Sequence, residues 1–167
     1  MLFVWRDTST NMFTSFQMIN SNPQKINDQT FEDLVFQPNG QVRPDCPFLS
    51  LSRYSVILRR WLRFFNLTQI LIIDGDEFKE DQINSLARAE EFIGARSYIT
   101  QDKFALNEQR GVYCIKTGPG ENDLQCLAGG KGRPHPDIAE DKLIALQEYF
   151  RPFNEDFFRV VGKRYNW

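Results

Sequence analysis

Apolar positions along the chain form two short continuous runs and several stretches with helical spacing. The runs Met1–Trp5 and Ile70–Ile73 are typical of strands buried on both faces of a sheet. A helix is predicted from about Thr10 to Asn20, directly after the first run, and the turn Asp74-Gly75-Asp76 is expected to close the second. Because strands and helices alternate, we predict an α/β fold in which helices flank a parallel sheet, within one domain over residues 1–167.

Amphipathic helices are predicted over much of the remaining sequence. The clearest extends from Tyr54 to Phe65, where apolar residues recur at helical spacing and the arginines lie mostly on other faces. Lys79–Ile93 is a second helix, and Gly94 is expected to cap its C-terminal end. The last two helices are predicted from Pro136 to Phe150 and from Asn154, a good N-cap, to Gly162.

Two long segments are predicted to be mainly loop. Residues 21–52 are rich in Pro, Asn, Asp and Ser, with a short helical turn expected near Phe31–Phe36. Residues 97–133 are also predicted to be loop-rich, and they contain two of the three cysteines. No internal repeat or domain linker interrupts this order of elements.

The composition is that of a folded domain, and the bulk charge does not identify a ligand. Hydrophobic residues make up 41% of the chain, with 15 Phe, which is enough to bury a core. The net charge of −2 gives no support to polyanion binding, so any such role must come from a local cluster of charges, and no nucleic acid is expected as a partner. Arg59, Arg60 and Arg63 form such a cluster and could contact a polyanion, but a solvated helix face is the simpler interpretation. No apolar run has the length of a membrane span, and a targeting segment of a secretory protein is expected outside these residues.

The cysteines and one sequon bear on the cellular compartment. Three Cys and a single His give no zinc signature. Cys114 and Cys126 bracket a polar, Gly-rich stretch, and a disulfide that closes such a loop would stabilise it by roughly 3 kcal/mol. Free thiols in a cytosolic protein explain the same spacing equally well. Asn66 begins a glycosylation sequon, which fits a secretory route, and the state of Cys46 is left open.

The segment Gly129–Pro136 has the composition of an anion cradle. Its three glycines let backbone approach a ligand closely, and Lys131 and Arg133 supply positive charge. It leads into a predicted helix N-terminus, where free N–H groups favour phosphate or sulfate. It is not a Walker A loop, because neither Ser nor Thr follows Lys131. A flexible basic surface loop is the alternative interpretation of the composition alone.

Several spaced motifs together resemble the heparan sulfate sulfotransferases, in particular the 3-O type. The paired cysteines followed by Lys131–Pro136 are similar to that family's disulfide and cofactor loop. Glu148–Asn154 with Phe157, and the closing Gly162 to Trp167, resemble the family's C-terminal helices. The helix residues Tyr54, Leu58, Trp61, Leu62 and Phe64, and the strand Ile70–Ile73 with Gly75, fit the same pattern. The resemblance covers essentially the whole chain.

The resemblance implies a P-loop-kinase-like parallel α/β fold and the cofactor 3′-phosphoadenosine 5′-phosphosulfate, PAPS. It also implies a Cys114–Cys126 disulfide and transfer of a sulfuryl group to a glucosamine hydroxyl of heparan sulfate in the Golgi lumen, where the full-length family is membrane-anchored. The cofactor-binding residues that it implies are Arg6, Thr14, Tyr113, Lys131, Gly132, Arg133, Pro134 and His135.

Each implied cofactor residue also has an ordinary structural interpretation. Arg6 and Thr14 are expected to hold the 3′-phosphate, but they could be a strand-end cation and a plain helix residue. Tyr113 corresponds to an aromatic position near the nucleotide and could instead pack beneath the loop. His135 could simply cap the following helix, so no catalytic role is assigned to it.

The family's phosphosulfate loop and its general-base Glu have no counterpart in these residues. We therefore assign no catalytic residue and expect the chain alone to be inactive. Three other functions remain open: a non-catalytic nucleotide- or glycan-binding module, an N-sulfotransferase-type domain, which shares the cofactor loop, and a relative of the nucleotide kinases, which the paired cysteines fit less well.

Overall fold

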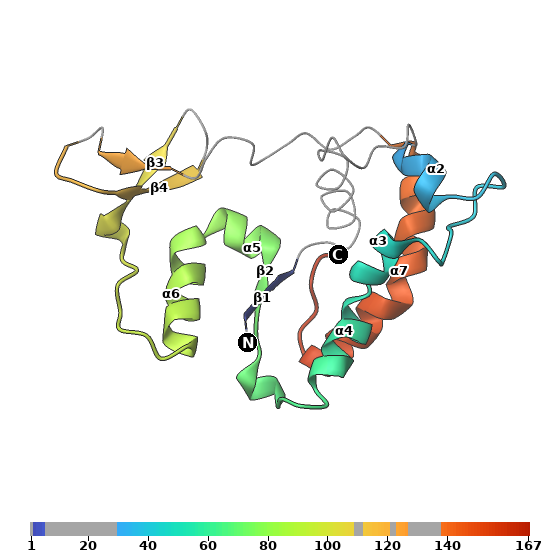
Figure 1. Ribbon diagram of the computed structural model, residues 1–167, viewed down its shortest axis with the longest axis horizontal. Helices are drawn as coiled ribbons and strands as arrows, with labels where there is room; N and C mark the ends of the chain where they lie inside the picture. Colours follow the sequence, from blue (N-terminus) through green and yellow to red (C-terminus); the bar gives the residue numbers. More distant parts are fainter. Residues whose placement is uncertain (1, 6–29, 109–111, 121–122, 127–137) are drawn as a thin grey trace. The chain divides into compact units, whose positions relative to one another are not determined.

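A computed structural model describes residues 2–5, 30–108, 112–120, 123–126 and 138–167 of the chain (Figure 1). The chain forms two compact units, which are described separately below. They comprise Met1–Val4 with Leu71–Pro134, and Trp5–Ile70 with His135–Trp167. A single domain over all 167 residues stays a prediction.

The second unit is built around one long helix, α7 (Glu140–Val161). The sequence predicted two helices separated by Pro152, and this prediction is wrong. Proline inside a helix removes one hydrogen bond and clashes with the preceding turn, at a cost of about 3 kcal/mol. Burial of Phe150 and Phe157, both fully enclosed on either side of Pro152, offsets that cost and keeps the helix continuous.

The ends of α7 agree only in part with the prediction. Asn154 is buried inside the helix and is not an N-cap. The predicted start at Pro136 lies outside the described residues, and α7 itself begins at Glu140 after Ala139. Gly162 adopts a left-handed conformation with φ of 75° and ends the helix, which confirms the predicted C-terminal boundary.

Two short helices complete one end of this core. The predicted helical turn near Phe31 is confirmed as α2 (Phe31–Val35), where the Thr30 hydroxyl accepts a hydrogen bond from the Asp33 backbone N–H at 3.2 Å. Helix α3 (Pro47–Leu51) was predicted as loop, and it begins with proline at its first position, where no N–H is needed.

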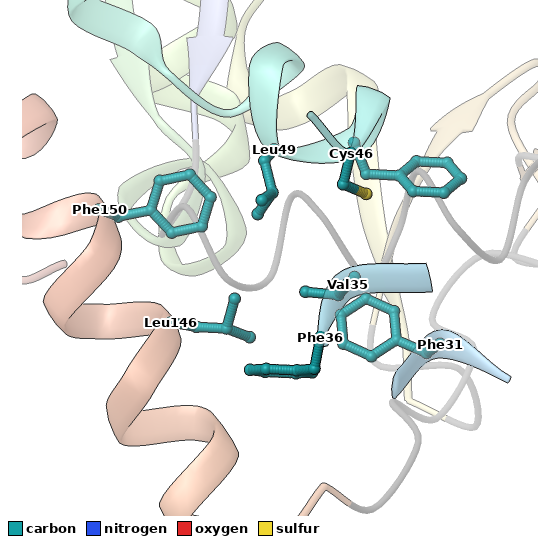
Figure 2. Close-up of a cluster of buried hydrophobic side chains, with 8 residues drawn as sticks. Phe31, Val35, Phe36, Cys46, Leu49, Leu146 and Phe150 are labelled. Atoms are coloured by element: carbon teal, nitrogen blue, oxygen red, sulfur yellow. The ribbon is translucent and has the colours of Figure 1, made fainter. Parts of the chain in front are cut away.

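The buried cluster between these helices and α7 is drawn in Figure 2, where Leu146 and Phe150 of α7 face the side chains of α2 and α3. Cys46 is a free cysteine in this cluster and is only 4% exposed, so it packs as a small apolar residue. The cluster consists of Phe31, Val35, Phe36, Cys46, Phe48, Leu49, Leu146 and Phe150.

Helix α4 (Tyr54–Trp61) packs against the C-terminal half of α7. It is shorter than the predicted Tyr54–Phe65, because the backbone N–H groups of both Phe64 and Phe65 turn back to the carbonyl of Trp61. Its buried faces meet an aromatic cluster formed with α7 and the segment after it. The rings of that cluster belong to Tyr54, Phe157, Phe158, Tyr165 and Trp167. A short 3₁₀ turn, η1 (Leu67–Gln69), follows α4.

The first unit contains both predicted buried strands. Strands β1 (Leu2–Trp5) and β2 (Leu71–Asp74) pair in a two-stranded sheet. Their parallel direction stays a prediction. The predicted turn after β2 is wrong, since Asp74 caps α5 (Gly75–Glu80) by accepting hydrogen bonds from the backbone of Asp76 and Glu77 at 2.8 and 3.1 Å.

The predicted helix Lys79–Ile93 is interrupted near its start. Asp81 ends α5 and caps α6 (Gln82–Phe92), accepting a hydrogen bond from the Asn84 backbone N–H at 3.2 Å. Gly94 follows with φ of 67°, in agreement with its predicted capping position. None of the helices in the described ranges combines the length and apolar character needed to cross a membrane.

The segment predicted to be loop-rich contains a small antiparallel sheet. After the 3₁₀ turn η2 (Gln101–Lys103), strands β3 (Phe104–Asn107), β4 (Val112–Lys116) and β5 (Leu124–Gln125) pair in that order. The loop prediction for this part of 97–133 is therefore wrong.

Candidate cofactor site

Of the predicted cofactor residues, the described part of the chain includes Tyr113. Tyr113 lies in β4, next to the disulfide cysteine Cys114. The remaining predicted residues lie outside the described part of the chain, so their side chains are not placed. They are Arg6, Thr14, Lys131, Gly132, Arg133, Pro134 and His135.

The predicted disulfide between Cys114 and Cys126 is confirmed. The two Cα atoms are 4.4 Å apart, and Cys114 is buried with 1% of its surface exposed. Cys114 sits opposite Ala105 of β3, and Cys126 comes directly after β5. The bond therefore joins the central strand of the small sheet to the residue from which the Gly-rich segment departs.

The loop closed by this disulfide has its own hydrogen-bonded turn. The backbone N–H of Thr117 donates to the carbonyl of Asp123 at 2.7 Å, and the N–H of Gly120 donates to the Asp123 carboxylate at 3.0 Å. A Cβ at Gly118 would overlap the Asp123 carboxylate, so a side chain there would displace the turn. These contacts hold together the two sides of the loop that the disulfide closes.

One face of the small sheet is apolar and exposed. Tyr113 pairs with Leu106 across the strands, and cross-strand partners point to the same face, as does Ile115 two residues further on. Exposed fractions are 39% for Tyr113, 49% for Leu106 and 45% for Ile115. The Tyr113 ring is thus open to solvent, which weakens the interpretation that it only packs beneath a loop. An exposed aromatic ring of this kind can stack on a nucleobase.

Charged groups flank this sheet. Lys103 lies over the ring of Tyr98, with its Nζ 3.3 Å from the ring centroid. A hydrogen bond from the side chain of Thr100 lowers the pKa of Asp102, with smaller contributions from Lys103 and Lys116. No group of His, Cys, Asp and Glu side chains within the described residues could hold a metal ion.

A separate cavity of about 450 Å³ lies within the second unit, between α7 and the segment that follows it. Its charged residues are paired with each other: Arg164 contacts Glu155 at 2.6 Å, and Arg151 contacts Glu148. Sequence reasoning did not anticipate it, because nothing in the pattern shows that the last residues fold back along α7. Its lining comprises Gln147, Glu148, Arg151, Asn154, Glu155, Phe158, Arg164, Tyr165, Asn166 and Trp167.

The position directly before α4 carries a side chain that contacts α7. Arg53 fills it, and its guanidinium lies over the rings of Tyr149 and Phe153 at 5.5 and 5.3 Å. The same group donates to the carbonyl of Pro44 at 2.7 Å. Arg53 therefore has a structural role that the sequence alone did not suggest.

Comparison with known sequences gives consistent relatives. The chain is 31% identical over 169 residues to heparan sulfate glucosamine 3-O-sulfotransferase 3B1 of Mus musculus, which covers 100% of this chain and 43% of that protein. It is 29% identical over 170 residues to heparan sulfate glucosamine 3-O-sulfotransferase 5 of Homo sapiens, with 100% and 49% covered. The human 3-O-sulfotransferase 6 is 31% identical over 139 residues, with 83% and 41% covered. No protein-family model matches the chain.

Comparison with solved structures confirms the fold class. The crystal structure of a sulfotransferase from Alicyclobacillus acidocaldarius superimposes with a TM-score of 0.65, covering 98% of this chain and 55% of that one. At 12% sequence identity, this likeness concerns the fold alone. The chain spans less than half the length of the relatives described above. It is thus homologous, from end to end, to a C-terminal portion of the heparan sulfate glucosamine 3-O-sulfotransferases.

Proposed function

We propose that these residues form part of a PAPS-dependent enzyme that transfers a sulfuryl group to a glucosamine 3-hydroxyl of heparan sulfate. The observation that carries this proposal is the agreement, over the whole chain, with relatives that bear this activity in their names. Because these relatives are 3-O-sulfotransferases, they favour the 3-hydroxyl as the acceptor over the amino group on which an N-sulfotransferase acts. The fold of the sulfotransferase neighbour is compatible with it.

The disulfide-bonded sheet supports a nucleotide site in the same region. The Cys114–Cys126 bond ties the start of the Gly-rich segment to the strand that carries Tyr113. In the proposed site, Tyr113 stacks on the adenine, and such stacking contributes about 1–3 kcal/mol per base. PAPS, when bound, supplies the sulfuryl group to be transferred.

The other proposed contacts are electrostatic. Arg6 and Thr14 would bind the 3′-phosphate, with the Arg guanidinium forming paired hydrogen bonds to it. Lys131 and Arg133 would bind phosphate oxygens, while Gly132 leaves room for the backbone to approach the ligand. Pro134 and His135 complete the segment before the following helix. The role proposed for these residues is to bind and orient the nucleotide, and no catalytic base is assigned among them.

The proposed compartment is the Golgi lumen. A disulfide persists in oxidising compartments and is rare in the cytosol. Asn66, which begins the sequon, is exposed at the start of the 3₁₀ turn η1, so an oligosaccharyltransferase could reach it. Both features support a secretory route.

Calorimetric titration with 3′-phosphoadenosine 5′-phosphate tests the proposed nucleotide site. We expect saturable binding by the unmodified protein, and at least a tenfold loss for Lys131→Ala, which removes a charged hydrogen bond of about 1.5–3 kcal/mol. Lys79→Ala is the matched control, since Lys79 is an exposed cation on α5. Absence of binding, or equal loss in both variants, would refute the site.

A transfer assay tests the activity. The 167 residues alone are expected to bind the nucleotide without moving labelled sulfate from PAPS to heparan sulfate. Sulfate transfer by these residues alone would show that they contain a catalytic base, contrary to the assignment above.

A further inference from the structure

The C-terminal ends of α4 and α7 lie next to each other. Arg59, in the last turn of α4, donates two hydrogen bonds to the carboxylate of Asp156 on α7, at 2.6 and 2.8 Å. Asp156 lies within the last two turns of α7. The C-terminal ends of both helices, which carry partial negative charge, therefore lie close together in the second unit, and this favours cations there.

The sequence around α4 is basic over a long stretch. From Cys46 to Ile73 the chain contains four arginines and no acidic residue, although the whole chain has a net charge of −2. Three of them, Arg59, Arg60 and Arg63, fall at the end of α4 and in the turn after it. Residues three and four apart are neighbours in a helical turn, so these arginines form one continuous group.

The carboxylates near this group are already used. Asp156 contacts both Arg59 and, at 3.3 Å, Arg159, while Glu155 pairs with Arg164 at 2.6 Å. The guanidinium groups of Arg59, Arg159 and Arg164 thus share two carboxylates, and Arg60 and Arg63 add two further positive charges close by in the sequence. Among the residues that the structure describes, neither Arg60 nor Arg63 forms an ion pair, and both are exposed.

An exposed aromatic residue, Phe64, follows Arg63 directly in the chain. Phe64 is four residues after Arg60 and is 78% exposed, the largest exposed fraction among the big apolar side chains described. Burying Phe64 against a partner would be favourable, because it removes apolar surface from water. A sugar ring offers a partly apolar C–H face for such a contact, while its sulfate groups could bind the adjacent guanidinium groups.

We propose that Arg59, Arg60, Arg63, Arg159 and Phe64, here called the basic patch, form a docking surface for a sulfated glycosaminoglycan. The planar guanidinium group can donate two parallel hydrogen bonds to two oxygens of one oxyanion, which suits it to a sulfate group better than the single ammonium of lysine. The choice of a sulfated glycan as ligand rests on the proposed function, and the existence of an anion-binding surface rests on the charges above. This proposal replaces the simpler interpretation of the cluster as a solvated helix face.

Binding of a fluorescent heparin oligosaccharide, measured at several NaCl concentrations, tests the basic patch. We expect Arg60→Glu with Arg63→Glu to weaken binding at least tenfold and to lower the slope of log K against log salt by about two, one for each lost contact. The matched control is Lys79→Glu with Arg96→Glu, which makes the same charge change at exposed cations of the first unit. The control is expected to change affinity less than threefold.

Equal weakening by both double variants would overturn the proposal, because net charge alone would then explain it. Unchanged binding by the patch variant, or equally tight binding of a DNA duplex or anionic vesicles to the unmodified protein, would also overturn it. Arg60→Gln with Arg63→Gln serves as a second variant if the charge reversal prevents folding, and its unfolding midpoint should match the unmodified protein. Nucleotide calorimetry on the patch variants separates this proposal from that of the cofactor site. If the variants bind the nucleotide but no longer bind heparin, the loss is specific to the basic patch. If the unmodified protein binds heparin but not the nucleotide, only the cofactor site is refuted.

Discussion

Arg53 and Tyr149 are joined by two interactions at once, although they are far apart in the sequence. The Arg53 guanidinium lies 5.5 Å from the centroid of the Tyr149 ring and also donates a hydrogen bond to its hydroxyl. The same guanidinium lies 5.3 Å from the centroid of the Phe153 ring, one turn further along α7. Arg53 precedes α4, so this contact attaches the start of α4 to the middle of α7.

Replacing Arg53 should therefore destabilise the second unit. We expect Arg53→Ala to lower the free energy of unfolding by about 1–2 kcal/mol, because partly buried cation–π and hydrogen-bonding contacts are lost together. Urea denaturation followed by tryptophan fluorescence measures the change. Arg60→Ala, which removes an exposed arginine within α4, should change the free energy of unfolding by less than about 0.5 kcal/mol. A similar effect of both variants would contradict the structural role of Arg53.

Pro152 is an exposed residue that interrupts the hydrogen bonding of α7. Substitution Pro152→Ala restores an N–H for the carbonyl of Glu148 and should stabilise the protein. Proline costs roughly 3 kcal/mol inside a helix, but it also restricts the unfolded chain, so the expected net gain is about 1–2 kcal/mol.

Differential scanning calorimetry of the Pro152 variant provides the measurement. Pro152→Gly restores the same N–H but adds backbone freedom to the unfolded chain, so it should stabilise less than alanine does. A lower unfolding temperature for Pro152→Ala would contradict the expected gain in stability.

Because Arg59 and Asp156 form an ion pair, we expect the free energy of unfolding to depend on pH in the acid range. The hydrogen bonds of this pair lower the pKa of the Asp156 carboxyl below the usual value, with further contributions from Arg159 and Ser55. A lowered folded-state pKa means that the stabilisation is fully present above the pKa of the unfolded chain. It is lost as the pH falls through the lower folded-state value.

Asp156→Asn isolates this contribution. The stability difference between the unmodified protein and the variant should be constant near neutral pH and should shrink toward zero in strong acid, with the change falling below about pH 4. Unfolding curves measured between neutral pH and strong acid would reveal it. A difference that instead grows in acid would contradict the assigned sign.

Of the three cysteines, we expect Cys46 to be a free thiol and Cys114 and Cys126 to be bonded to each other. Thiol-specific labelling should modify no cysteine readily in the folded protein, since Cys46 is buried and the other two are bonded. After denaturation without reductant, mass spectrometry should find a single label, on Cys46. Reduction should expose the other two and lower the stability by roughly 3 kcal/mol, the value for closing a loop of this size. Labelling of Cys114 before reduction would contradict the disulfide.

Local sequence signals predicted the elements that depend on local chemistry. The apolar runs predicted β1 and β2 near their observed positions, and the helical turn expected near Phe31–Phe36 is present as α2. Proline misled the prediction for α7, because the burial that overrides it comes from helices distant in the sequence. The strands of the small sheet were missed because they are short and lie in a segment rich in polar residues and glycine.

The candidate site could be predicted as a set of residue types and spacings but not as a geometry. Of the predicted cofactor residues, Tyr113 is the one that the described part of the chain places, and its exposure depends on which face of β4 is covered. The basic patch had a readable sequence signal, the acid-free stretch from Cys46 to Ile73. The net charge of the basic patch depends on which of its arginines form ion pairs with carboxylates on α7. Those pairs follow from the packing of α4 against α7, which the sequence does not show.

The dependence of the second unit on α7 has a consequence for biosynthesis. Helices α2, α3 and α4 bury their apolar faces against a helix that begins roughly 80 residues after α4 ends. At ribosomal speeds of about 5–20 residues per second, those faces stay uncovered for roughly 4–16 s after α4 has been made. During that interval the nascent chain displays Phe31, Phe36 and Leu49 to its surroundings, which makes this part of the polypeptide a natural client for chaperones that hold newly made segments.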